Sequence, residues 1–397
     1  MINKTLHCPT CAFVLAAALA ASACQNDSVP EQSAPPVPPT PPAGSVTPVV
    51  GVSPSGPGER ENVAGRTTSE DVMKAADSDM KEVLTQLDTL GGKPLSALEP
   101  ALARRQPTPA DAVNKVLQKS AKPTTPLAMA RVDERLIPGA KGAIAARVYT
   151  PMVDAKKALP VIAYWHGGGF VLADLDVYDA SARALADEAD AIVVSLDYRR
   201  APANKFPAAH EDAFAGYQWV LKNAESFGGD PKRVAVAGES AGGNLAANVS
   251  IRARDEKVQP PVHQLLVYPV AQTDTNTESY AQWANASPLD KASMEWFVKN
   301  YTNKPEDLQD ARLNLVSAKL DHLPKTTIVL AEIDPLRSDG ELLAKKLKAA
   351  GVDVETKLYE GVTHEFFGMG AVVADAKSAE EYAGGRLKDA FGKRPRR

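Results

Sequence analysis

Cysteine is nearly absent from this chain. Among 397 residues only Cys8, Cys11 and Cys24 are cysteines, so the chain beyond residue 24 holds no disulfide framework. The spacing of Cys8 and Cys11 fits a redox or metal site, but both lie in a segment that we expect to be removed. An excess of positive charge is also missing. The 45 Lys and Arg against 49 Asp and Glu give a formal net charge of −4, which argues against a nucleic-acid partner.

The apolar run near the N-terminus is too short to span a membrane, which takes about 20 residues. It covers residues 12–21 and follows Lys4, and Ala21-Ser22-Ala23 at its end forms a small-residue cleavage site. This is the pattern of a secretory signal peptide over residues 1–23. Cys24 follows directly, as in a bacterial lipoprotein signal, although Ala21 stands where such signals usually have Leu or Val. We therefore expect an exported protein. It is either lipid-anchored through Cys24 in the cell envelope, on the periplasmic side, or periplasmic or secreted after plain cleavage.

Proline is abundant and clustered. Ten of the 31 prolines lie between Pro30 and Pro57, where Glu31 is the only charged residue. Such a composition buries no apolar core, so we expect residues 24–61 to be an extended spacer. Helical patterns at 69–90 and 108–118 then predict a helical cap region over residues 62–130. We expect the main domain over residues 131–397, with a helical cap insertion around 275–305.

Short apolar runs alternate with helical patterns along the main domain. The runs are typical of buried strands and cover residues 144–149, 161–165, 192–196, 234–237, 265–268, 327–330 and 354–359. Helical patterns between them cover residues 180–187, 210–221, 244–253 and 338–349. This alternation predicts an α/β fold with a mostly parallel central sheet flanked by helices.

One serine lies in a pattern that is typical of a nucleophile. Gly238-Glu239-Ser240-Ala241-Gly242 fits Gly-x-Ser-x-Gly, directly after an expected strand and at the start of a helical pattern. A nucleophile elbow needs this context, because its turn is so tight that Gly238 and Gly242 must be small. By itself the motif also fits a glycine-rich turn without a catalytic role.

A second glycine-rich run, His166-Gly167-Gly168-Gly169-Phe170, follows the strand expected at 161–165. Three successive glycines leave backbone N–H groups uncovered. A tetrahedral acyl intermediate needs such donors about 3 Å from its oxygen. The run fits neither of the common nucleotide-phosphate loops, so it favours an oxyanion site.

A serine nucleophile needs a histidine base and a carboxylate that orients it, in the chain order Ser, Asp or Glu, His. Three of the six histidines follow Ser240, and His364 lies just after the last expected strand. Asp334 follows the strand at 327–330, although it also fits a helix N-cap before Pro335. A metallohydrolase is not favoured, because the His364-Glu365 pair lacks the second histidine of His-Glu-x-x-His.

Over roughly residues 65–390 the chain resembles the hormone-sensitive-lipase-like family of α/β-hydrolases. Five ordered motifs carry the resemblance: His166–Phe170, Asp197-Tyr198-Arg199 with Ala201-Pro202 and Phe206-Pro207-Ala208-Ala209, Gly238–Gly243, Asp334-Pro335-Leu336-Arg337, and His364-Glu365-Phe366. The departures from the family pattern are Glu239 for the commoner Asp, Arg200, Ala203 and Asn204 for Leu, Glu and His, and Ser338-Asp339 for Asp-Glu.

The resemblance implies a serine carboxylesterase that hydrolyses short- to medium-chain acyl esters through an acyl-enzyme. It assigns Ser240 as nucleophile, His364 as general base and acid, and Asp334 as the orienting carboxylate. It assigns the oxyanion hole to the N–H groups of Gly168, Gly169 and Ala241, with His166, Gly167, Gly238 and Gly242 supporting the two motifs. No cofactor and no metal is implied, and the expected partner is a small ester.

The same set of residues is also compatible with other functions. A lipase, lactonase, amidase or deacetylase would use the same acyl-transfer chemistry. A non-catalytic binder, like the plant gibberellin receptors of this fold, is disfavoured because those receptors lack the histidine base. Phe170, Trp283, Trp296 and Phe297 are candidates either for the wall of an acyl pocket or for the core of the cap. Oligomeric state is not predicted.

Overall fold

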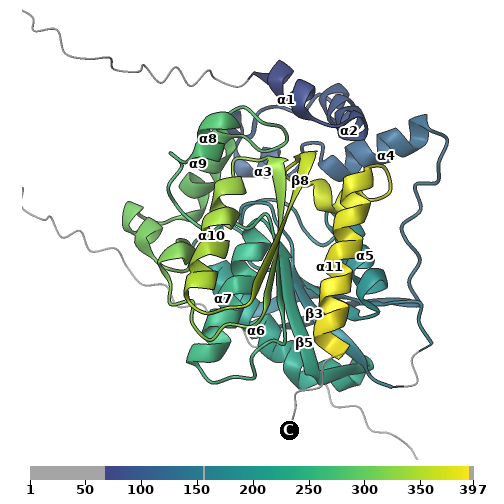
Figure 1. Ribbon diagram of the computed structural model, residues 1–397, viewed down its shortest axis with the longest axis vertical. Coiled ribbons are helices and arrows are strands. Elements are labelled where there is room, and N and C mark those ends of the chain that lie inside the picture. Colours follow the sequence, from purple (N-terminus) through teal and green to yellow (C-terminus); the bar gives the residue numbers. More distant parts are fainter. Residues whose placement is uncertain (1–67, 155–156, 393–397) are drawn as a thin grey trace, which may run out of the picture. The chain divides into compact units, whose positions relative to one another are not determined.

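A central sheet of eight strands runs through the protein (Figure 1). We describe it from a computed structural model that covers residues 68–154 and 157–392, so the expectations for the signal segment, for Cys24 and for the spacer lie outside the described residues. The strands are β1 (Arg131–Gly139), β2 (Gly142–Thr150), β3 (Leu159–Trp165), β4 (Ile192–Leu196), β5 (Gly229–Glu239), β6 (Gln264–Val267), β7 (Thr326–Ile333) and β8 (Val354–Thr363). Their order in the sheet is β1-β2-β4-β3-β5-β6-β7-β8.

The sheet is mostly parallel, as predicted. Only β1 with β2 and β2 with β4 pair antiparallel, and the other neighbours are parallel. In β3 the side chains of Val161, Ala163 and Trp165 pack into one buried cluster. Those of Ile162 and Tyr164 pack into a second cluster, because successive residues of a strand point to opposite faces. Both faces of the sheet are therefore covered.

Helices from different parts of the chain cover the two faces (Figure 1). Helices α5 (Asp179–Ala189) and α11 (Ala374–Gly392) pack together on one face, and α6 (Ala208–Asn223), α7 (Ala241–Asp255) and α10 (Arg337–Ala349) lie on the other. Short 3-10 turns add η2 (Ala224–Phe227), η3 (Pro305–Gln309), η4 (Leu315–Ser317) and η5 (Phe366–Met369). The α/β layering predicted from the alternating pattern is confirmed.

Two segments far apart in the sequence lie side by side above the sheet, at the top of Figure 1. The first holds α1 (Ser69–Ala75), α2 (Ser78–Thr89), η1 (Leu95–Ala97), α3 (Pro100–Ala103) and α4 (Pro109–Lys119), and the second holds α8 (Glu278–Gln282) and α9 (Lys291–Tyr301). Helix α9 packs on η1. There the indole Nε1–H of Trp296 donates to the carbonyl oxygen of Leu98 at 2.9 Å.

The helix expected at 69–90 is in fact two helices. Ala76 and Asp77 between them are extended, with ψ of 147° and 162°. The N–H of Asp77 donates to the carbonyl oxygen of Gly361 at 2.8 Å, so the chain leaves the helix to bond the end of β8. Apolar spacing alone does not reveal such a break, because Val72 and Met80 on either side of it are both buried.

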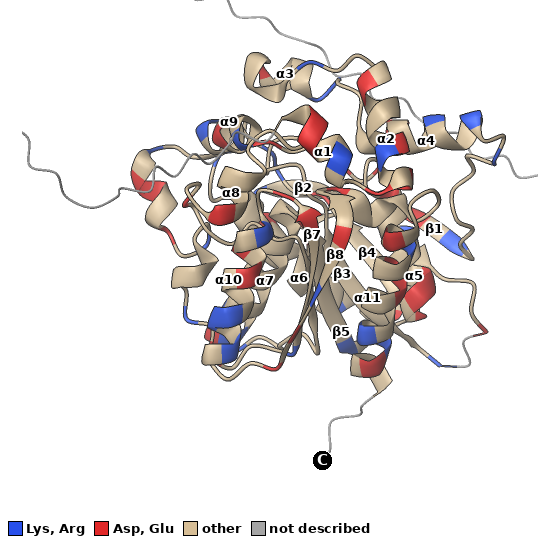
Figure 2. Cartoon of the chain, turned by 45° about the horizontal axis from the view of Figure 1, so that its top comes forward, with Lys and Arg blue, Asp and Glu red and all other residues tan. Residues whose placement is uncertain are grey.

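Charges of both signs are interspersed over the surface helices (Figure 2). Among the described residues, no helix is both long and apolar enough to cross a membrane.

Candidate active site

Ser240 lies at the turn between β5 and α7. Its backbone has φ of 56° and ψ of −117°, a region that non-glycine residues rarely occupy and that costs of order 1–3 kcal/mol. The flanking glycines allow this turn. A Cβ on Gly238 would lie 2.2 Å from the carbonyl oxygen of Gly242, and a Cβ on Gly242 would lie 1.9 Å from that of Trp165. The Gly-x-Ser-x-Gly pattern is thus a packing requirement of the elbow.

A continuous chain of hydrogen bonds links Ser240, His364 and Asp334. The Ser240 hydroxyl lies 3.0 Å from His364 Nε2, to which it donates, and His364 Nδ1 donates to Asp334 Oδ2 at 2.7 Å. The three residues follow β5, β8 and β7, whose carboxyl ends meet at one edge of the sheet. Asp334 Oδ1 accepts the N–H of Leu336 at 2.8 Å, so its carboxylate is fixed at both oxygens.

The imidazole of His364 is buried among carboxylates. Burial is the largest single influence and disfavours the charged form, but the neighbouring carboxylates, Asp334 foremost, together outweigh burial and raise the pKa of His364 above its ordinary value. Glu365 and Glu239 raise it further. The ring of Tyr268 lies 4.4 Å from that of His364, centroid to centroid. The arrangement makes His364 a better proton acceptor than a free imidazole.

The glycine run after β3 lines the same cavity as Ser240 and His364. The carbonyl of Gly168 accepts the N–H groups of Val171 and Leu172 at 3.0 and 2.8 Å, which closes a tight turn. Within the described chain, the N–H groups of Gly168 and Gly169 have no protein acceptor. The N–H of Ala241, in the first turn of α7, has none within its helix. These are the three donors expected at an oxyanion hole.

His166 supports this loop and does not contact Ser240. Its Nε2 lies 3.2 Å from Asp197 Oδ1, and its ring stacks on that of Tyr198 at 4.5 Å. The Tyr198 hydroxyl donates to the carbonyl oxygen of Gly167 at 2.9 Å. The position matches the structural role expected for His166.

A buried carboxylate beside the nucleophile was not singled out from the sequence. Glu239 accepts the hydroxyls of Tyr164 and Tyr268, both at 2.6 Å, and burial raises its pKa to about 7. On the other side, both oxygens of Glu365 accept the Tyr178 hydroxyl at 2.7 Å. The sequence did contain a sign of this role, because Glu239 directly precedes Ser240 and Glu365 directly follows His364.

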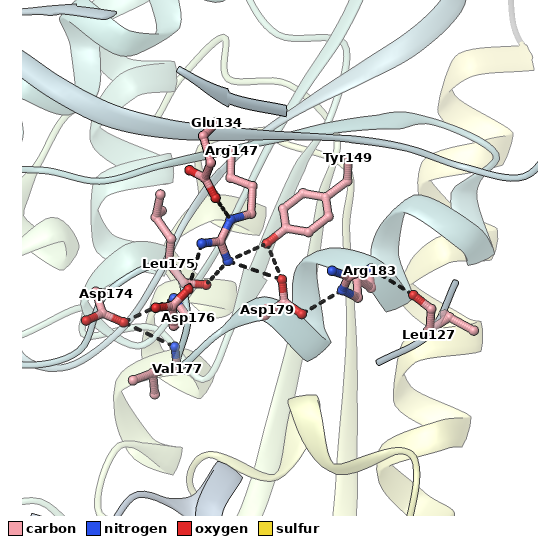
Figure 3. A network of polar contacts seen from close by, with 10 residues as sticks. All are labelled: Leu127, Glu134, Arg147, Tyr149, Asp174, Leu175, Asp176, Val177, Asp179 and Arg183. Carbon is pink, nitrogen blue, oxygen red and sulfur yellow. Dashed lines mark hydrogen bonds and ion pairs between the residues drawn. The ribbon is translucent and has the colours of Figure 1, made fainter. Parts of the chain in front are cut away.

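An ion-pair network anchors the segment that leads from the glycine run into α5 (Figure 3). Arg147 on β2 reaches Asp176 at 2.6 Å and Asp179 at 3.2 Å, and it also pairs with Glu134 on β1. The Tyr149 hydroxyl donates to Asp179 at 2.7 Å. The Arg147–Asp179 pair is shielded from solvent, because these side chains are only 16% and 20% exposed, whereas Glu134 and Asp176 are 62% and 80% exposed. The shielded pair holds the start of α5 against β2.

A cavity of about 940 Å³ opens onto Ser240 and His364. Of the four aromatic residues that were candidates for its wall or for the core of the cap, Phe297 lines it and the other three do not. Phe170 instead stacks on Tyr301 at 4.2 Å, while Trp283 and Trp296 are buried in the hydrophobic clusters. All three rings are buried, and Trp296 also links the two cap segments through its hydrogen bond to Leu98.

No group of three His, Cys, Asp or Glu side chains in residues 68–154 and 157–392 is arranged to hold a metal ion. The site brings together a serine, a histidine, a carboxylate and backbone N–H groups.

The sheet order, the elbow and this constellation define a class, and the family model described as "alpha/beta hydrolase fold" matches residues 162–368. The chain belongs to this family, in its hormone-sensitive-lipase-like branch. "Carboxylesterase NlhH" of Mycobacterium tuberculosis is 42% identical over 255 residues, 63% of this chain and 79% of that protein. "Ethyl acetate hydrolase" of Pseudomonas putida is 32% identical over 288 residues, 71% of this chain and 88% of that protein. The hyperthermophilic esterase of Pyrobaculum calidifontis superposes with a TM-score of 0.71 at 35% identity, over 79% of this chain and 98% of that one.

Proposed function

We propose that the protein is a serine carboxylesterase that uses Ser240, His364 and Asp334 as its catalytic triad. The observation that carries this proposal is the hydrogen-bonded chain from Ser240 Oγ through His364 to Asp334, which opens into the cavity. Acyl transfer through a serine ester needs a nucleophile, a general base and a group that orients the base, and these three residues supply them.

In the first half-reaction the Ser240 hydroxyl oxygen attacks the ester carbonyl carbon, while His364 Nε2 takes its proton. The imidazolium then gives that proton to the departing alkoxide, and the acyl group stays on Ser240. Asp334 stabilises the imidazolium and holds the tautomer with the proton on Nδ1. In the second half-reaction a water oxygen attacks the acyl carbon while His364 Nε2 takes a proton from it. The bond between the acyl carbon and Ser240 Oγ then breaks, the imidazolium returns the proton to Ser240 Oγ, and the acid leaves.

The N–H groups of Gly168, Gly169 and Ala241 stabilise the oxyanion of each tetrahedral intermediate. One such donor contributes about 3 kcal/mol to the transition state. The rigid turn at Gly168 and the fixed start of α7 supply the donors without reorganisation. A Cβ at Gly169 would lie 2.2 Å from a Phe297 ring atom, so the cap packs directly on this loop.

We propose acyl groups of short to medium length. The support is the similarity to a protein named for ethyl acetate hydrolysis. Lipases, lactonases, amidases and deacetylases share the triad chemistry.

The test is a panel of p-nitrophenyl esters of rising acyl length with the wild-type protein. We expect the highest kcat/KM between acetate and octanoate. Hydrolysis of none of them would contradict the proposal, and a maximum at palmitate would replace it with a true lipase. Parallel assays on lactones, anilides and acetylated polysaccharide separate the remaining classes.

We also propose that the protein is exported and anchored through a lipid on Cys24, with residues 24–61 as a spacer. The support is the sequence pattern around Ala21-Ser22-Ala23-Cys24. Cells that express the full chain should incorporate labelled palmitate into it. The Cys24→Ser variant should lose this label, and the Cys11→Ser variant should keep it at the wild-type level. Absence of label on the wild type would leave a periplasmic or secreted protein and reject the anchor.

A further inference from the structure

Two arginines from distant parts of the chain line the cavity. Arg104 follows α3 in the cap, and Arg200 follows β4. Both fasten the segment that continues the glycine run. Arg104 Nε donates to the carbonyl oxygen of Val171 at 2.9 Å, and Arg200 Nη1 donates to that of Ala173. Each arginine is therefore held in place by these hydrogen bonds while it lines the cavity.

The positive charge of this pair is poorly compensated. Arg104 donates its second hydrogen bond to another carbonyl, that of Ala201, at 2.5 Å, and none of the described carboxylates forms an ion pair with it. The nearest acid to Arg200 is Asp197, at 3.6 Å, and Asp197 also accepts from His166. Burial and repulsion by Arg200 lower the pKa of Arg104, although a guanidinium stays charged at neutral pH.

None of the other charged residues described in the cavity wall forms an ion pair with Arg104 or Arg200. Its carboxylates are Asp88, Asp174, Asp290 and Glu365, and its third cation is Lys93. Glu365 accepts from Tyr178, and Asp290 caps α9 by accepting the N–H of Ser293 at 2.6 Å. Asp174 accepts the N–H groups of Asp176 and Val177. Three of the four acids thus have protein donors, whereas Arg104 has no acidic partner in the described part of the chain.

We propose that Arg104 and Arg200 bind a carboxylate of the substrate, so that this esterase prefers half-esters of dicarboxylic acids over neutral esters of the same length. The inference rests on the proposed function. A guanidinium matches a carboxylate with two parallel N–H···O bonds, and an anion between two like charges also relieves their repulsion. Hydrolysis adds water across the ester bond and releases the alcohol and a dicarboxylate.

The substrates that test this are the monoethyl esters of succinate, glutarate and adipate, each paired with the neutral ethyl ester of the same acyl length: butyrate, valerate and hexanoate. Ethanol release gives kcat/KM for each. We expect the anionic member of at least one pair to be preferred about tenfold or more. The chain length with the largest preference reports the distance between Ser240 and the arginines.

Arg200→Leu should lower the ratio of anionic to neutral kcat/KM about tenfold, mainly through KM of the half-ester. Arg252→Leu is the matched control. Arg252 lies on α7, away from the cavity wall, and forms a surface ion pair with Glu256. Its replacement removes the same charge and should leave the ratio of anionic to neutral kcat/KM at the wild-type value. If Arg200→Leu does not fold, inhibition of the wild type supplies the readout: glutarate should compete with ethyl valerate, and glutaramide should not.

The outcomes separate the two proposals. Hydrolysis of neither ester class would reject the esterase itself. Hydrolysis of both classes with equal kcat/KM, or an unchanged ratio in Arg200→Leu, would reject the carboxylate subsite and leave the esterase in place.

Discussion

Ser240→Ala is expected to abolish ester hydrolysis, with a loss of about 10⁶-fold in kcat. Among the described residues the Ser240 hydroxyl is the group placed to form the acyl-enzyme, since it donates to His364 Nε2 at 3.0 Å and lines the cavity. Alanine has no oxygen to attack the carbonyl, and the remaining donors stabilise only the slow attack of water. The fold should survive, because the substitution removes one atom from a side chain that makes no other hydrogen bond among the described residues.

The measurement is hydrolysis of p-nitrophenyl butyrate, together with labelling by a fluorophosphonate that reacts only with an activated serine. Wild type should be labelled and Ser240→Ala should not. Ser250→Ala, in α7, is a matched control: it removes a buried hydroxyl that donates only to the carbonyl oxygen of Ala246, and it should retain labelling. Full activity of Ser240→Ala would reject the mechanism, and label on another serine would relocate the site.

The buried strands were predictable because they are apolar on both faces. The run at 192–196 coincides with β4 (Ile192–Leu196), all of whose residues are buried. By contrast, β1 lies at the sheet edge, where only Ile137 of its nine residues is buried, so no apolar run marked it. Helix α11 was missed for a related reason: its buried face is made of alanine, glycine and few large residues, such as Ala379, Ala383 and Leu387.

The residues that meet at the site were predictable as far as each follows a strand. Ser240, Asp334 and His364 all do, and parallel strands bring their carboxyl ends to one edge. The cavity wall was not predictable in this way. Arg104 and Arg200 are almost a hundred residues apart and meet only because the cap folds over the sheet. The same packing turns Trp296 away from the cavity, through its bond to Leu98.

Asp334→Asn is expected to lower kcat about 10⁴-fold while leaving the fold intact. Asp334 is fully buried and accepts the proton on His364 Nδ1 at 2.7 Å. An amide of the same shape can present its N–H₂ there, which favours the tautomer with the proton on Nε2. That tautomer cannot accept the Ser240 proton, and the imidazolium loses its counter-charge.

The pH profile of the residual activity distinguishes this role from a merely structural one. Protonated His364 cannot act as a base, so kcat/KM falls as the pH drops through the pKa of His364. Burial lowers that pKa, and Asp334 makes the largest of the contributions that raise it above its ordinary value. In Asp334→Asn burial remains and the Asp334 charge is gone, so the acidic limb should move to lower pH. Asp339→Asn is the matched control: Asp339 is equally buried but accepts from Ala271 and Gln272, and the variant should keep the wild-type limb. An unmoved limb in Asp334→Asn, or a loss of less than about tenfold, would contradict the assignment of Asp334.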